Sequence, residues 1–302
     1  LMIRRPPRST QSRSSAASDV YKRQVSQAER CCRDLAQGVQ ELRRVADWLR
    51  QRNRDEEAPP SVGRLEVYAL GEGRVVRDGR PVSPSEWQAA TAKEMFFYLL
   101  INGPTERDVL GLVFFPELSS KGMIDSFHTT IYRLRRALGS GIVTIEEGRY
   151  RIGDVDLWFD VREFERCVER ARLLPPQDWR AADLWGRAVA LYRGEFLPEA
   201  ERIWAVQVRE RLHEHYVEAL CGMARCHRAR GDFEGAIEWY RRALAGDATR
   251  EDIHRQIMRC YEHAGRRADA IAQYHRCREI LNQELGVEPE PETQQLLRDL
   301  TG

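Results

Sequence analysis

The sequence predicts a mainly helical protein in which a small domain of mixed α and β structure is followed by an all-α domain of helical repeats. Three observations predict this fold class. Short alternating strands enclose a helical stretch between residues 64 and 153. One helix of that stretch, residues 119–138, has one apolar face and one face of hydroxyls and arginines. Beyond residue 154 the pattern is helical throughout and repeats at an offset of 34 residues.

Length and composition fit a folded chain of two or three domains. The 302 residues are 42% hydrophobic and 31% charged, which is typical of globular rather than disordered proteins. The longest apolar run, Met95 to Ile101, is too short to cross a bilayer, so we expect no membrane partner. The net charge of +1 predicts no particular partner, but it is unevenly spread: +5 over 1–63, +1 over 64–153 and −5 over 154–302.

The first 63 residues are expected to lie outside the folded domains. Residues 1–24 are basic and serine-rich, lack the apolar core of a secretory signal, and resemble a translated sequencing-adapter artefact. A basic arm for nucleic acid is the alternative for this segment. Val25–Arg54 has the apolar spacing of an amphipathic helix. The charges, proline pair and glycine of Asp55–Gly63 are typical of a linker. Together, 25–63 are interpreted as the end of a truncated upstream module.

No pattern in the chain predicts enzyme chemistry, a cofactor or a metal. There is no Walker loop, GxSxG or HExxH motif. The seven cysteines form no CxxC pair, so we expect them to be reduced and buried in a cytoplasmic protein. Cys221, Cys226 and His227 have an unconvincing spacing for zinc, and His213 and His215 lie on different helical faces. Four tryptophans of the helical half are expected to pack in its core: Trp179, Trp185, Trp204 and Trp239.

Residues 64–115 predict two strands and then two helices. Leu65 to Ala69 alternate between apolar and polar positions, and Asp78-Gly79 is a hairpin turn signal before the next short strand. Ala92 to Ile101 form an apolar helix. A second helix is expected to begin with Thr105 as its N-cap and to end before Pro116.

The third helix carries the functional signal. It is expected to begin at Ser119-Ser120 and to end at Gly139. Its apolar positions, spaced three and four apart, form one narrow stripe: Ile124, Phe127, Ile131, Leu134 and Leu138. Roughly opposite lie Ser126, Thr129, Arg133 and Arg136. Small hydroxyls and arginines on one face suit the major groove of DNA, and an ordinary solvated face is the alternative.

A hairpin, residues 142–152, follows this helix and completes the pattern of a winged helix. The runs Thr105–Leu110, Tyr132–Gly139 and Gly148–Ile152 resemble the winged-helix domain of the SARP family, the Streptomyces antibiotic regulatory proteins, which are OmpR-type activators. The resemblance implies that Ser126, Thr129, Arg133 and Arg136 face bases or nearby phosphates. It also implies that Lys121, Thr130 and Arg149 hold phosphates. Glu146 and Glu147 at the wing tip put contact between the wing and the minor groove in doubt.

The helical half, residues 154–302, contains a tetratricopeptide-like repeat. Six identities recur at the 34-residue offset, pairing Arg225, Cys226, Gly231, Ala236, Ile237 and Tyr240 with Arg259, Cys260, Gly265, Ala270, Ile271 and Tyr274. Residues 164–174 and 181–192 are expected to form an earlier helix pair, and 291–300 a capping helix. This half resembles the bacterial transcriptional activator domain that accompanies the SARP winged helix.

The two resemblances imply a transcriptional activator rather than an enzyme. Its expected partners are double-stranded DNA with promoter direct repeats, RNA polymerase, and a second copy bound head to tail on DNA. Two alternatives stay open from the sequence. In the first, the chain is a protein-interaction scaffold whose winged helix has lost DNA binding. In the second, it is a fragment of an enzyme whose active part lies upstream.

Overall fold

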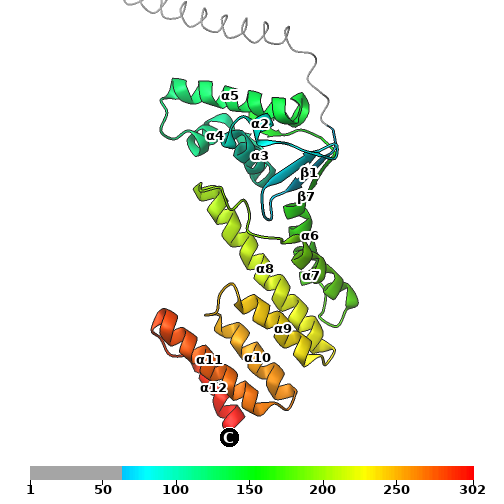
Figure 1. Cartoon of the computed structure of the whole chain (residues 1–302), viewed down its shortest axis with the longest axis vertical. Helices are drawn as coiled ribbons and strands as arrows, with labels where there is room; N and C mark the ends of the chain where they lie inside the picture. The colour runs from blue at the N-terminus through cyan, green and yellow to red at the C-terminus, as the bar shows by residue number, and fades with distance from the viewer. Residues whose placement is uncertain (1–62) are drawn as a thin grey trace, which may run out of the picture. The chain divides into compact units, whose positions relative to one another are not determined.

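The computed structural model of the chain describes residues 63–302, which belong to one compact unit (Figure 1). The predicted artefact at 1–24 and nearly all of the predicted helix and linker at 25–63 lie outside the described residues. Within the described part the fold is mainly helical, with two small sheets in its N-terminal half. This arrangement confirms the predicted fold class.

The first sheet supports the winged-helix half from one side. Its strands follow the order β3-β2-β1-β7, with β1 Leu65–Tyr68, β2 Arg74–Arg77, β3 Arg80–Pro81 and β7 Leu157–Phe159. The predicted turn is present, because Asp78 and Gly79 both have positive φ, 50° and 77°. The strand β7 was not predicted. It pairs parallel to β1, with Leu65 opposite Leu157.

Four helices pack on one another beside this sheet: α2 Pro84–Trp87, α3 Ala90–Asn102, α4 Arg107–Phe114 and α5 Ser120–Leu138. The short α2 was not predicted; Ser83 and Glu86 close its first turn as a capping box. Buried aromatic and aliphatic side chains from these helices fill the centre: Phe96, Phe97, Leu99, Leu110, Phe127 and Leu134. This core fixes the direction of α5.

The second sheet is the wing together with a strand from the helical region. Its order is β4-β6-β5, with β4 Thr105–Glu106, β5 Val143–Glu146 and β6 Arg149–Ile152. The prediction that Thr105 caps α4 is wrong. Thr105 pairs with Tyr150 of the wing, its hydroxyl donates to the Gly103 carbonyl at 3.0 Å, and α4 begins at Arg107 without a side-chain cap. A contact 45 residues away along the chain has overridden the local capping signal.

The helical half consists of seven helices in the described chain: α6 Asp160–Arg172, α7 Trp179–Leu191, α8 Ile203–Ala229, α9 Phe233–Leu244, α10 Glu251–His263, α11 Arg267–Leu285 and α12 Pro291–Thr301. Successive helices from α6 to α12 pack against one another (Figure 1). The predicted pair 164–174 and 181–192 corresponds to α6 and α7, and the predicted capping helix to α12.

The 34-residue repeat appears as two equivalent helical hairpins. Gly231 and Gly265 both adopt left-handed backbone, with φ of 78° and 73°, where each first helix turns into the second. Ala236 and Ala270 are completely buried, which allows the two helices of each hairpin to approach closely. The repeat predicted from sequence is therefore a structural repeat as well.

The tryptophan prediction holds only in part. Trp185 is buried, whereas Trp204 and Trp239 are half-buried. The prediction is wrong for Trp179, which is 71% exposed at the first position of α7. The apolar pattern did not show that Trp179 lies at the end of α7 and not on the face of the helix that packs in the core.

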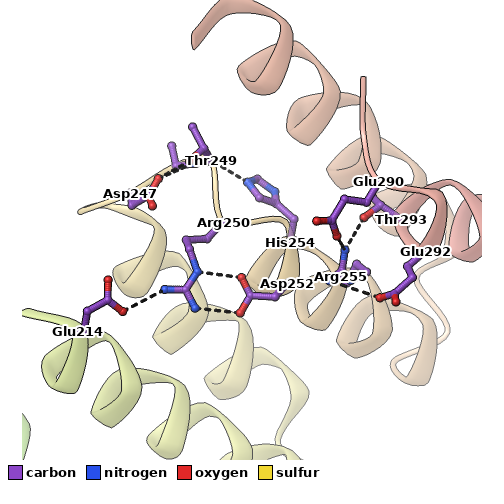
Figure 2. A network of polar contacts seen from close by, with 11 residues as sticks. Glu214, Asp247, Thr249, Arg250, Asp252, His254, Arg255, Glu290, Glu292 and Thr293 are labelled. Carbon is purple, nitrogen blue, oxygen red and sulfur yellow. Dashed lines mark hydrogen bonds and ion pairs between the residues drawn. The ribbon is translucent and has the colours of Figure 1, made fainter. Parts of the chain in front are cut away.

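Polar contacts tie the last helix onto the repeats, as Figure 2 shows. The guanidinium of Arg255 on α10 donates to Glu290 and to the Thr293 hydroxyl, both at 2.8 Å. Glu251 accepts from the backbone N–H of Glu290 at 2.9 Å and from the hydroxyl of Thr293 at 2.8 Å. Since Thr293 is completely buried, these bonds fix α12 against α10.

The two halves are joined by buried contacts. The backbone N–H groups of Ala69 and Leu70, just after β1, donate to the carboxylate of Asp160 at 2.9 and 3.0 Å. Arg202, before α8, donates to Glu94 on α3 at 2.8 Å and to the Val113 carbonyl at 3.1 Å. The predicted boundary between 153 and 154 thus passes just before β7, a strand that completes the sheet of the first half.

Candidate nucleic-acid interface

The helix α5 is fixed by its buried face. The hydroxyl of Ser119, its predicted cap, accepts from the N–H of Gly122 at 3.4 Å. Phe127, Ile131, Leu134 and Leu138 of the predicted stripe are buried, and Ile124 at the N-terminal end is half-buried. The opposite face is therefore turned away from the core.

Three basic side chains of the outer face are free of intramolecular pairing. Lys121 and Arg136 are exposed and Arg133 is half-buried. None of the three makes a hydrogen bond or an ion pair with another residue of the described region. Their charges are therefore available to an external anion such as a DNA phosphate or to the acceptor edge of a guanine.

The predicted hydroxyl residues of α5 differ in position. Thr129 is exposed and its hydroxyl donates to the Asp125 carbonyl at 2.9 Å, which leaves the oxygen able to accept. Ser126 is half-buried. Thr130 does not support the prediction of a phosphate contact, because it is only 4% exposed and its hydroxyl donates to the Ser126 carbonyl at 2.8 Å. The buried face of α5 is wider than the stripe of large apolar residues predicted.

The wing carries one exposed cation and a compensated acidic group. Arg149 is exposed and lies 3.6 Å from Glu106 on the neighbouring strand β4. Glu146 forms an ion pair with Nε of Arg151 at 2.6 Å, so its charge is countered within the wing. Arg151 also binds Asp154 at 3.0 Å, and this hydrogen bond lowers the pKa of the Asp154 carboxyl. Glu147, in the turn with φ of 49°, is the acidic group left at the tip.

Two arginines that the sequence did not single out position α5 relative to its surroundings. Arg135 donates from Nη2 to the Val143 carbonyl at the start of the wing, at 3.0 Å. Arg77 on β2 donates to the Ala137 carbonyl at the end of α5. Each residue acts on a neighbouring element: the acceptor of Arg135 is 8 residues away in the sequence and that of Arg77 is 60 residues away. Together they hold the recognition face and the wing in one frame.

His128 adds no positive charge to this face near neutral pH. Desolvation and the nearby Arg107 lower the pKa of its imidazole. The face is therefore basic through lysine and arginine side chains. In the described part of the chain, no three metal-ligating side chains cluster, and no helix is both long and apolar enough to cross a membrane. The conceivable zinc ligands Cys221 and Cys226 are free thiols.

Comparison with known proteins explains this combination of domains. Residues 159–300 match the model of the bacterial transcriptional activator domain. The regulatory protein AfsR of Streptomyces coelicolor is 27% identical over 239 residues, which cover 78% of this chain and 24% of that protein. These matches support the predicted resemblance to the SARP family. That family consists of regulators and is not a class of enzymes.

One further relative and one solved structure extend the comparison. The regulatory protein AfsR of Streptomyces griseus is 27% identical over 174 residues, covering 57% of this chain and 18% of that protein. A structure of Mycobacterium tuberculosis EmbR in complex with a low-affinity phosphopeptide superposes with a TM-score of 0.67 at 23% identity, covering 79% of this chain and 65% of that one. This second likeness concerns the fold alone. The chain spans a quarter or less of the length of the AfsR proteins.

Proposed function

We propose that this chain is a SARP-family transcriptional regulator that binds double-stranded DNA in a sequence-specific manner, with α5 in the major groove. One observation carries the proposal. The helix α5 buries one face in the domain core and turns toward solvent a face whose Lys121, Arg133 and Arg136 have no partner among the described residues. A rigid helix with unpaired basic side chains and small hydroxyls is the element that major-groove readers use.

The proposed roles follow from reach and chemistry. Arg133 and Arg136 contact guanine edges or nearby phosphates, because a guanidinium donates two parallel hydrogen bonds to either. Ser126 and Thr129 permit close approach and accept or donate at base edges. Lys121 and the wing residue Arg149 bind phosphates. Glu147 keeps the tip of the wing away from the DNA backbone, since like charges repel.

The helical half is proposed to contact proteins rather than DNA. Residues 154–302 have a net charge of −5, which disfavours binding to a polyanion. We infer that this half contacts RNA polymerase or a second copy of the chain and that the outcome is activation in the cytoplasm. Promoter direct repeats fit protomers bound head to tail. The match to an activator domain supports this assignment.

The proposal is tested by selecting duplexes from a random pool with the full chain. We expect enrichment of one sequence present in two copies of the same orientation. The same selection with Arg133→Ala/Arg136→Ala should lose the enrichment, whereas Arg230→Ala/Arg259→Ala, two exposed arginines of the helical half, should keep it. If no duplex is enriched by the unaltered chain, the proposal fails and a protein-interaction scaffold becomes the better account.

A further inference from the structure

The helical half contains a polar hollow that its role as a scaffold does not require. The hollow has a volume of about 500 Å3 and lies among α6, α8, α9 and α10. Its lining includes Arg172, Arg225, Arg228, Tyr240, Arg250 and Gln256. Four arginines around one cavity are unusual in a domain half whose net charge is −5.

Two of these arginines are already neutralised by acids in the same wall. Arg172 donates from Nε to Glu218 at 2.8 Å and binds its second oxygen as well. Arg250 holds both carboxylate oxygens of Asp252, at 2.9 and 3.0 Å, and lies 3.8 Å from Glu214, as Figure 2 shows. The acidic groups of the hollow are therefore committed to these pairs.

The polar groups of the hollow that lie outside these ion pairs are hydrogen-bond donors. Arg225 makes no hydrogen bond or ion pair with any residue of the described region. Arg228 meets no carboxylate there and donates to the side-chain oxygen of Gln256 at 2.6 Å. Tyr240 is 1% exposed, and its hydroxyl finds no hydrogen-bond partner in the described chain although it borders the hollow. Burial raises the pKa of Tyr240 to about 12, so this hydroxyl stays protonated and donates.

We propose that this hollow binds the phosphate group of a small phosphate monoester through Arg225, Arg228 and Tyr240. Four guanidiniums against three carboxylates give the lining a net charge of +1, and Arg225 and Arg228 form no ion pair with a carboxylate of the described chain, so both can bind a phosphate oxygen. The Tyr240 hydroxyl, which has no hydrogen-bond partner in the described chain, donates a further hydrogen bond to a phosphate oxygen in this site. The volume falls in the range of small-molecule sites, about 300–1,000 Å3.

The remaining groups of the wall set which ligand fits. Glu214, Glu218 and Asp252 limit the net positive charge of the lining to +1, so one phosphate group is favoured over a chain of several acidic residues. His215 also borders the hollow, and its Nδ1 is buried without a partner. The site does not depend on whether α5 binds DNA.

Isothermal titration of the full chain tests the site. The probes are ribose 5-phosphate, ribose, inorganic phosphate and a peptide of clustered aspartates. We expect ribose 5-phosphate to bind with one-to-one stoichiometry, inorganic phosphate more weakly, and ribose and the acidic peptide not at all. Arg225→Gln should weaken ribose 5-phosphate binding at least about tenfold, and Tyr240→Phe several-fold.

The repeat supplies a matched control. Arg259 occupies the position equivalent to Arg225 in the next hairpin, but it is exposed and does not line the hollow. Arg259→Gln should leave the affinity for ribose 5-phosphate unchanged. Thermal melting of each variant identifies any loss of fold, and Arg228→Gln is a second variant if Arg225→Gln melts early.

Three results would overturn the proposal. The first is absence of heat with ribose 5-phosphate and inorganic phosphate at millimolar concentration. The second is an affinity for ribose 5-phosphate that is the same in Arg225→Gln, Arg228→Gln and Arg259→Gln. The third is tighter binding of the aspartate peptide than of ribose 5-phosphate, which would assign the hollow to an acidic protein segment.

Discussion

The carboxyl group of Asp160, at the junction of the two halves, should make stability depend on pH in a specific direction. Asp160 is 3% exposed and accepts from the backbone N–H groups of Ala69, Leu70 and Val161. Burial raises its pKa to about 6 from 3.8, against the lowering effect of these donors. The change proposed is Asp160→Asn, which has nearly the same shape and does not titrate.

The sign follows from linkage. A carboxyl whose pKa is higher in the folded state binds its proton more tightly when folded, so unfolding releases protons between the two pKa values. The contribution of Asp160 to the free energy of unfolding is therefore fully present below about pH 4 and is lost as the pH rises through about 6. The difference between the two pKa values corresponds to about 3 kcal/mol.

Urea unfolding of the chain and of Asp160→Asn, from about pH 4 to about pH 7, measures this term. Subtracting the free energy of unfolding of the variant from that of the unaltered chain removes the contribution of all other carboxyls. The difference should fall by about 2 kcal/mol across this range, because part of the full term is already lost at pH 4. A difference that grows with pH would show that the three amide donors outweigh burial and would refute the reasoning.

Three further predictions concern the junction, the helical half and the wing. Arg202→Ala removes an ion pair and a hydrogen bond to a backbone carbonyl across the junction, so it should lower the free energy of unfolding by about 1–3 kcal/mol. Arg187→Ala breaks an exposed ion pair on α7 and should change the free energy of unfolding by less than about 0.5 kcal/mol. Both are measured by urea unfolding. Gly231→Ala should lower the free energy of unfolding by about 1–2 kcal/mol, because Gly231 has a positive φ. Gly186→Ala inside α7, where an added Cβ meets its neighbour at ordinary contact distance, should raise the free energy of unfolding by up to about 1 kcal/mol. Equal effects of the two changes would count against the hairpin geometry. Glu147→Gln should raise affinity for a selected duplex in a fluorescence titration at low salt, and an unchanged affinity would place the wing tip far from the DNA.

The helical elements were predictable because their signals are local. The three-and-four spacing of Phe127, Ile131 and Leu134 depends only on residues within a few turns, and the structure buries all three. The hairpin glycine Gly231 is likewise a local requirement, and its equivalent one repeat later confirmed the period of 34 residues.

The elements that the sequence did not predict depend on distant partners. The strand β7 has three residues and forms only because β1, about 90 residues earlier, offers a free edge. Thr105 has the residue type of an N-cap, but the wing captures it as a strand. Thr130 is a small polar residue that borders the apolar stripe, and the packing around α5 covers it. Such positions are decided by tertiary contacts, which outweigh local propensity.

The candidate interface was predictable to the same extent. Arg133 and Arg136 follow from helical geometry, since they lie opposite a buried stripe. Arg135 lies between them in sequence, yet it turns to the Val143 carbonyl and supports the wing. At about 100° per residue, Arg135 lies only about 60° from the centre of the apolar stripe, whereas Arg133 and Arg136 lie about 140° and 160° from it. The spacing therefore places Arg135 beside the packed face, but its acceptor on the wing is set by tertiary structure.

The salt dependence of binding to a selected duplex tests the central claim most directly. The chain should lose affinity linearly on a logarithmic scale as salt rises, because phosphate contacts release counterions. Arg133→Ala/Arg136→Ala should lose about 1–3 kcal/mol for each lost base contact, while Arg230→Ala/Arg259→Ala should match the unaltered chain. Equal affinities and equal slopes for the two double variants would contradict the account, because α5 would then be a solvated face and not the DNA-reading helix.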